Sequence, residues 1–171
     1  MDNTIENDST NGWYAVKKGR LRMNISTMRA ASGGIMTWGE NPADDEIDLV
    51  NSARFVYTDG TWENKTVTGS LYATDRTDIP DVETLSVRGS VSSIWDFTTS
   101  VAAPYKVDLH VRYDHSLVGS MKPVLLKHTG SGWQKVATEE LSGYRLEAND
   151  LDSLGWFAVV AAPHATLLIA R

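Results

Sequence analysis

The sequence predicts an all-β fold, an antiparallel β-sandwich with little or no helix. Three observations lead to this prediction. Apolar and polar residues alternate with a period of two over several segments of the 171-residue chain, whereas apolar residues at helical spacing are hard to find. Turns containing Gly or Asp separate these segments at short intervals. A composition of 42% hydrophobic and 22% charged residues is that of a globular protein able to bury one sizeable core.

The clearest predicted strand covers residues 105–114. Its odd-numbered residues are apolar or aromatic, and its even-numbered residues are charged or histidine. Alternation sustained over this length requires one buried face and one solvated face. We therefore expect this strand to be central in its sheet, with the odd-numbered side chains in the core.

Two hairpins are predicted from their turns. Asp59-Gly60 favours a tight turn after a strand at residues 53–58, because both residues tolerate a positive φ. A second hairpin is predicted over residues 122–138, with its turn in the Gly-rich stretch at residues 129–132.

The end of the chain predicts a strand of a different kind. Residues 155–162 are apolar on both faces, which is typical of a central, fully buried strand. Just before it, Asn149 predicts a single capped helical turn at residues 149–154. The other predicted strands cover residues 21–27, 65–74, 82–91, 144–147 and 166–170.

The predicted domain organisation is simple. Residues 1–11 are polar and predict a flexible arm, and residues 12–171 predict a single β-sandwich domain. An alternative is two β lobes divided near residues 75–81, where three aspartates and a proline gather. The same stretch is equally compatible with a long crossing between two sheets.

Charge and composition argue against several functions. The formal net charge is −6, and the densest basic stretch, around Lys17 and Lys18, predicts the solvated side of a strand. We therefore expect no nucleic-acid binding, since that affinity comes mainly from clustered positive charge. The absence of cysteine excludes disulfides, thiolate metal sites and cysteine nucleophiles. The longest apolar stretch, residues 156–170, is interrupted by Pro163 and predicts no membrane insertion.

A family resemblance is carried by two segments in the last third of the chain. These are KPVLLKHTGSGWQKV at residues 122–136 and GWFAVVAA at residues 155–162. A strand, a Gly-rich turn followed by Trp, and a closing Phe-Ala-Val strand resemble immunoglobulin-like or fibronectin-like sandwich modules of large exported bacterial proteins. The resemblance implies a non-catalytic structural or interaction module in an extracellular or cell-surface setting, with neighbouring domains or copies of itself as partners. A jelly-roll-like sandwich remains an alternative to the immunoglobulin-like arrangement.

Tryptophans supply the candidate ligand-binding residues. Most of the six are expected in the core, because large aromatic side chains are mostly buried. Trp62 follows Asp59-Gly60 and Trp133 follows a Gly-Ser-Gly turn, so both are expected at strand ends, exposed to solvent. Exposed aromatic rings there would let the protein stack on a surface glycan, which makes a carbohydrate-binding module the alternative function.

A calcium site is predicted in an acidic loop. Carboxylate oxygens are the ligands that Ca²⁺ prefers, and loops at the ends of a sandwich can supply them. The spacing differs from that of an EF-hand, so a solvated acidic loop is the competing interpretation. The candidate ligands are Glu40, Asp44, Asp45, Glu46 and Asp48.

Catalytic motifs are missing from the sequence. The four histidines lack the spacing of a zinc-binding helix, and no nucleophile elbow of the Gly-x-Ser-x-Gly type occurs. Paired carboxylates for glycoside cleavage depend on three-dimensional separation, so a hydrolase stays open as a third interpretation. The sequence favours a protein that is not an enzyme and has no cofactor apart from the possible calcium.

Overall fold

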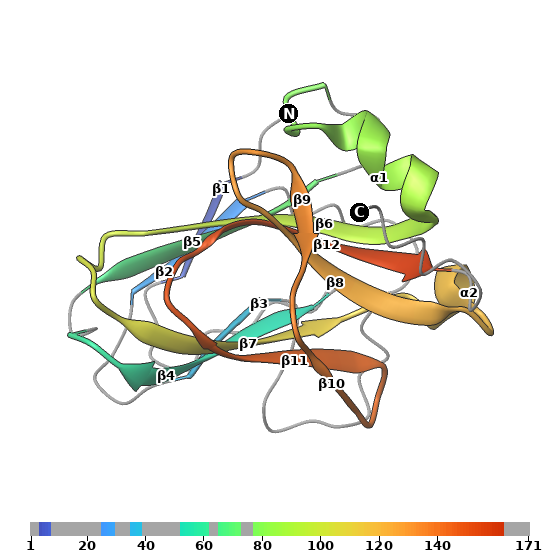
Figure 1. Cartoon of the computed structure of the whole chain (residues 1–171). Helices are drawn as coiled ribbons and strands as arrows, with labels where there is room; N and C mark the ends of the chain where they lie inside the picture. Colours follow the sequence, from blue (N-terminus) through green and yellow to red (C-terminus); the bar gives the residue numbers. More distant parts are fainter. Residues whose placement is uncertain are drawn as a thin grey trace.

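The computed structural model describes residues 4–7, 25–29, 35–38, 52–61, 65–72 and 77–162. These ranges contain twelve strands and two short helices, and the strands form two stacked sheets (Figure 1). All strand pairs between residues 25 and 162 of the described ranges are antiparallel. The predicted all-β sandwich is confirmed.

The larger sheet has seven strands in the order β1-β2-β5-β6-β12-β8-β9. Its strands are, in that order, Thr4–Asn7, Ile25–Arg29, Thr66–Tyr72, Ser90–Thr99, Gly155–Ala162, Lys122–His128 and Trp133–Lys135. The smaller sheet has five strands in the order β10-β11-β7-β4-β3. They are Glu139–Leu141, Arg145–Leu151, Lys106–Arg112, Ala53–Asp59 and Ile35–Trp38.

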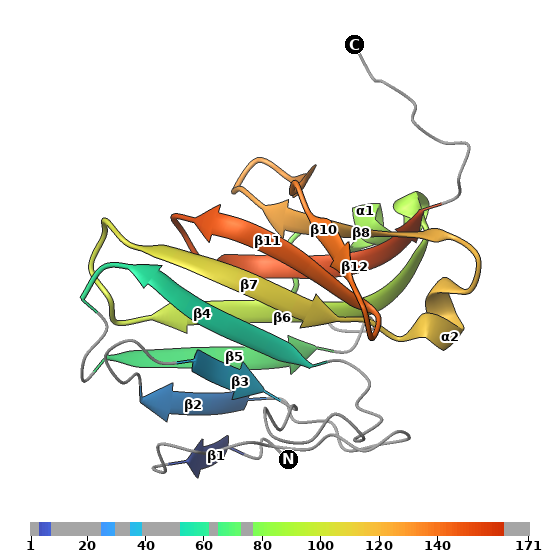
Figure 2. The same ribbon diagram turned by 90° about the horizontal axis from the view of Figure 1, so that it is seen from below.

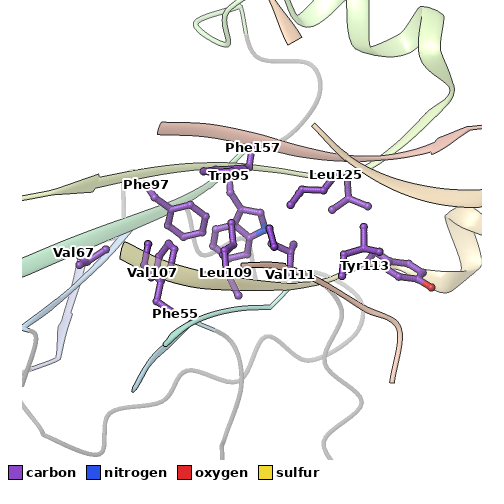
Figure 3. Packing of buried hydrophobic residues seen from close by; sticks show 14 of the residues in the cluster. Phe55, Val67, Trp95, Phe97, Val107, Leu109, Val111, Tyr113, Leu125 and Phe157 are labelled. Atoms are coloured by element: carbon purple, nitrogen blue, oxygen red, sulfur yellow. The ribbon is translucent and has the colours of Figure 1, made fainter. Parts of the chain in front are cut away.

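Strand β7 occupies the centre of the five-stranded sheet, between β11 and β4, as the alternation predicts. Its odd-numbered side chains point into the space between the sheets, where they belong to the main core (Figure 3). On the opposite, partly solvated face, His110 Nε2 lies 3.0 Å from Glu147 Oε1. The buried residues of this stretch are Tyr105, Val107, Leu109, Val111 and Tyr113.

Aromatic rings fill the middle of the main core. Phe97 from the seven-stranded sheet meets Phe55 from the five-stranded sheet edge-on, with ring centroids 4.7 Å apart. Trp95 stacks beside Phe97 at 5.4 Å, and Phe157 packs at 6.1 Å. These rings join the two sheets and account for much of the apolar surface removed from water.

Strand β12 is central and buried on both faces, as predicted. Phe157, Val159 and Ala161 belong to the core between the sheets, whereas Ala158 and Val160 belong to a second apolar cluster on the outer face of the seven-stranded sheet. Helix α1 (Val82–Arg88) lies over that outer face (Figure 1). The helix therefore forms a partial third layer, and it explains why β12 carries no polar side.

The strand predicted at residues 82–91 is wrong, because its first part is helix α1. Asp81 precedes the helix, and its carbonyl oxygen accepts a hydrogen bond from the Thr84 backbone N–H. Leu85 is fully buried in the second cluster, so burial of one apolar side chain favours the helix over the weak alternation. Gly89 ends the helix with a φ of 145°, a value that favours glycine.

Two connections also differ from prediction. Asp59-Gly60 does not close a hairpin, because β4 and β5 belong to different sheets. Residues 77–81 are not an inter-sheet crossing, because β5 and β6 on either side of the segment are antiparallel neighbours in one sheet. Ile79 from this segment is buried in the second apolar cluster.

Two local predictions are corrected as well. Residues 4–7, expected within a flexible arm, form β1 and pair in parallel with β2. The helical turn expected at residues 149–154 is the irregular end of β11, whose register shifts between Ala148 and Leu151. Asp150 there has a φ of 57°, and its backbone N–H donates to Asp108 Oδ1 at 2.8 Å.

Candidate functional site

Of the two tryptophans predicted to be exposed, the structure describes Trp133. Trp133 is 3% exposed, so the prediction that it is a solvent-facing aromatic is wrong. Its indole Nε1–H donates to the Pro80 carbonyl oxygen at 3.0 Å, and its ring meets His128 edge-on at 5.3 Å. The turn does place Trp133 at the start of β9, but the segment before α1 covers it. A buried indole offers no stacking face to a ligand.

The other predicted site residues lie outside the described residues. These are Trp62 and the proposed calcium ligands Glu40, Asp44, Asp45, Glu46 and Asp48, so both roles stay predictions. Among the residues that the structure does describe, no three histidine or acidic side chains gather closely enough to hold a metal ion.

His128 and Asp81 form a pair that resembles part of a catalytic dyad. His128 Nε2 lies 2.9 Å from Asp81 Oδ2, while His128 Nδ1 accepts the Gly130 backbone N–H at 3.2 Å. Since Nδ1 accepts, Nε2 carries the proton and donates it to the carboxylate. Both ring nitrogens are therefore engaged, and no lone pair points outward for a general base. The pair ties the β8–β9 hairpin to the start of α1.

A polar cluster occupies one end of the sandwich. Lys127 Nζ donates to Ser153 O and Oγ at 2.7 and 2.6 Å, and Lys106 Nζ donates to Asp150 O at 3.1 Å. Burial lowers the pKa of the Lys127 ammonium. The hydrogen bond from Ser153, followed by the charges of Lys106 and Lys127, lowers the pKa of Asp152.

A depression of about 380 Å³ opens beside this cluster. Lys106, which lines the depression, already donates a hydrogen bond to the Asp150 carbonyl oxygen. The Tyr105 hydroxyl accepts the Leu154 backbone N–H at 3.1 Å. The polar groups here mainly hold the loop between β11 and β12, so this end has a structural explanation. The depression is lined by Asp59, Ala103, Pro104, Tyr105, Lys106 and Asp152.

The opposite end of the sandwich presents an exposed aromatic residue, Tyr144. It lies in the three-residue turn that joins β10 to β11, because Leu141 pairs with Arg145. Tyr144 is 45% exposed, yet its backbone is left-handed, with a φ of 61°. A bulky side chain in this conformation is an outlier that costs about 1–3 kcal/mol and persists only when its surroundings enforce it.

Three contacts hold Tyr144 in this conformation. Its carbonyl oxygen accepts the Tyr113 backbone N–H at 3.0 Å, which fixes the turn to the end of β7. Its ring stacks on the ring of His115, with centroids 4.2 Å apart and planes inclined by 13°. Tyr113 also meets the Tyr144 ring, at a centroid distance of 6.0 Å and an angle of 63°.

His115 is positioned by the short helix α2 (His115–Val118), which joins β7 to β8 at this end (Figure 2). The side chain of Asp114 caps the helix, with Oδ1 accepting the Ser116 backbone N–H at 2.8 Å. The Asp114 backbone N–H donates to Ser92 Oγ at 2.7 Å, which anchors the helix start to β6. The backbone that carries the exposed His115 side chain is therefore anchored to β6 and β7.

Glu140 completes the group. Its Oε1 accepts the Tyr113 hydroxyl at 2.7 Å, and the carboxylate itself is exposed. Burial, followed by this hydrogen bond and the charge of Glu140, raises the pKa of Tyr113. We call Tyr113, His115, Glu140 and Tyr144 the rim cluster. It combines one exposed aromatic ring, one exposed imidazole and one carboxylate held in place by a buried tyrosine.

Tyr144 is not among the site residues predicted above, although the signal for it is present in the sequence. Tyr144 directly follows Gly143, just as Trp133 follows Gly132, so both are aromatic residues beside a turn. What the sequence does not indicate is which turn is covered by another segment. The Trp133 turn is covered and the Tyr144 turn is not.

Comparison with protein families, curated proteins and solved structures found no match. The resemblance to immunoglobulin-like or fibronectin-like modules therefore stays a prediction. Within the described part of the chain, neither helix is long and apolar enough to cross a membrane.

Proposed function

We propose that this protein is a non-catalytic interaction module of an exported or cell-surface protein, and that the rim cluster is the surface through which it contacts its ligand. The location outside the cell is supported by the resemblance carried by residues 122–136 and 155–162. Ligands of three classes fit such a module, namely a neighbouring domain, a second copy of the chain, or a surface glycan.

The conformation of Tyr144 carries this proposal. A glycine at this position would adopt a φ of 61° without strain, whereas tyrosine destabilises the turn. The partly buried side chain and its ring contacts with His115 and Tyr113 offset part of this strain, while 45% of the residue stays exposed. Backbone strain of this kind gathers at binding and active sites. We therefore assign the exposed part of the Tyr144 ring to contact with a ligand.

Replacing Tyr144 by Gly separates folding from binding. The substitution relieves about 1–3 kcal/mol of backbone strain and removes ring contacts worth about 0.5–1.5 kcal/mol. Because these two effects oppose each other, the free energy of unfolding should fall by no more than about 1 kcal/mol. Binding should be lost. We would measure stability by urea unfolding, and binding by interferometry on a panel of immobilised oligosaccharides, random peptides and the protein itself.

A matched control is Gln134→Ala, which alters an exposed side chain on β9, at another edge of the molecule. It should leave both stability and binding unchanged. The proposal is overturned if no probe in the panel binds in a Tyr144-dependent way. It is equally overturned if Tyr144→Gly costs several kcal/mol, since Tyr144 would then be a stabilising residue of the fold.

A further inference from the structure

We infer that the ligand of the rim cluster is a neutral carbohydrate, with one sugar ring stacked on Tyr144. This inference rests on the proposed function and narrows it to one ligand class. A pyranose has an apolar C–H face and an edge of hydroxyl groups. The rim cluster offers a partly exposed aromatic ring, stacked on His115, together with the polar side chains of Glu140 and His115.

The small apolar area of the rim favours a sugar over a protein partner. Among the side chains that the structure describes, the large hydrophobic ones that are exposed are Leu117 and Tyr144. A stable protein interface buries about 1,200–2,000 Å² and centres on several apolar anchors. Here the exposed large apolar side chains are one ring and one leucine, and exposed residues of β10, the turn and α2 beside them are polar or glycine. These include Ser116, Glu140, Ser142 and Gly143.

The ring of Tyr144 is fixed before a ligand arrives. Its backbone is bonded to Tyr113, and its ring rests on His115, which α2 holds in turn. A weakly apolar ligand such as a sugar gains little on contact, so binding depends on avoiding the entropy loss of ordering side chains. The stacked pair of rings removes that loss in advance, at the cost of the strained turn.

Polar groups at the rim match sugar hydroxyls. Glu140 Oε1 is held 2.7 Å from the Tyr113 hydroxyl, which orients the carboxylate. A carboxylate has about four acceptor positions, so it retains capacity to accept hydroxyl protons. His115 adds ring nitrogens that can donate or accept. The carboxylate and the net charge of −6 repel uronic-acid and sulfated chains, so the glycan is a neutral one.

Calorimetric titration of the intact chain tests the inference. The probes are neutral oligosaccharides (gluco-, manno-, xylo- and chito-hexaoses), an oligo-galacturonate, and any peptide that binds in the interferometry panel. We expect at least one neutral oligosaccharide to bind. Tyr144→Gly should weaken this binding at least tenfold, while Tyr144→Phe, which keeps the ring, should stay within about threefold.

Leu117→Ala distinguishes a sugar from a protein surface. Leu117 is exposed at the same end but outside the rim cluster, so its truncation should leave oligosaccharide binding unchanged. Tyr144-dependent binding of a peptide or of the protein itself, without oligosaccharide binding, overturns the inference and leaves the proposed function standing. Preferential binding of the galacturonate also overturns it. If no probe binds in a Tyr144-dependent way, both proposals fail.

Discussion

Replacing Leu109 by Ala tests whether the core between the sheets holds this protein together. Leu109 is fully buried on β7, and the residues opposite it on β4 and β11 are Phe55 and Ala148, both fully buried as well. Removing three carbon atoms at about 0.8 kcal/mol each gives a transfer cost of about 2.4 kcal/mol. Because strands on both sides hold the backbone, the site cannot collapse, and a residual cavity raises the total to about 3–5 kcal/mol.

Urea unfolding followed by tryptophan fluorescence measures this loss, since Trp95 lies in the same core. The slope of free energy against urea should stay constant, which would show that the variant unfolds from the same fold. Leu117→Ala is the matched control, because the same atoms are removed from a side chain that is 47% exposed. Its cost should be within about 0.5 kcal/mol. A Leu109→Ala loss below that value, or equal to the control, would refute the assignment of this face to the core.

Two further predictions concern backbone packing and pH. Gly89→Ala should cost more than about 3 kcal/mol or prevent folding, because the added Cβ would lie 1.9 Å from the Ala161 carbonyl oxygen. The control is Gly130→Ala, which has open space around the added Cβ and should cost only about 1 kcal/mol. Far-ultraviolet dichroism and urea unfolding check both, and equal losses would contradict the packing argument. The pKa of Tyr113 is raised in the folded state, so above pH 10, the ordinary pKa of tyrosine, the unfolded state releases this proton first and stability falls. With Tyr113→Phe, the free energy of unfolding should decline less steeply with pH between pH 10 and 12, by up to about 1.4 kcal/mol per pH unit in urea unfolding. An unchanged slope would mean that Tyr113 ionises as easily in the folded state as in the unfolded state.

The sequence predicts this fold well where a single periodicity governs a segment. Alternation at residues 105–114 and the apolar run at residues 155–162 both predict a central strand, and both are central. Periodicity fails at residues 82–91, because a segment this short fits two periods. There the helix is favoured by Leu85, whose burial between α1 and the seven-stranded sheet depends on strands far away in the chain.

The candidate site was less predictable, for a reason that applies to Trp133 and Tyr144 alike. Both follow a glycine in a turn, and local sequence gives them the same expected exposure. Their actual exposures, 3% and 45%, differ because Pro80 and its neighbours cover one turn. Coverage of a turn by a distant segment is a tertiary property. The left-handed backbone of Tyr144 is not indicated by the sequence either, because the glycine that would favour this conformation is the preceding residue, Gly143.

The short link from β9 to β10 has a consequence for how copies of this chain could join. These strands are the edges of the two sheets on one side of the sandwich, and residues 136–138 connect them directly (Figure 1). Both edge strands are also only three residues long and offer little backbone to another strand. On the other side, β1 and β3 each have one neighbour among the described strands. A strand added on the β9–β10 side would meet two three-residue edges joined by the residue 136–138 link, and it would gain few backbone hydrogen bonds from either edge. Edge-to-edge association through β9 and β10 is therefore disfavoured.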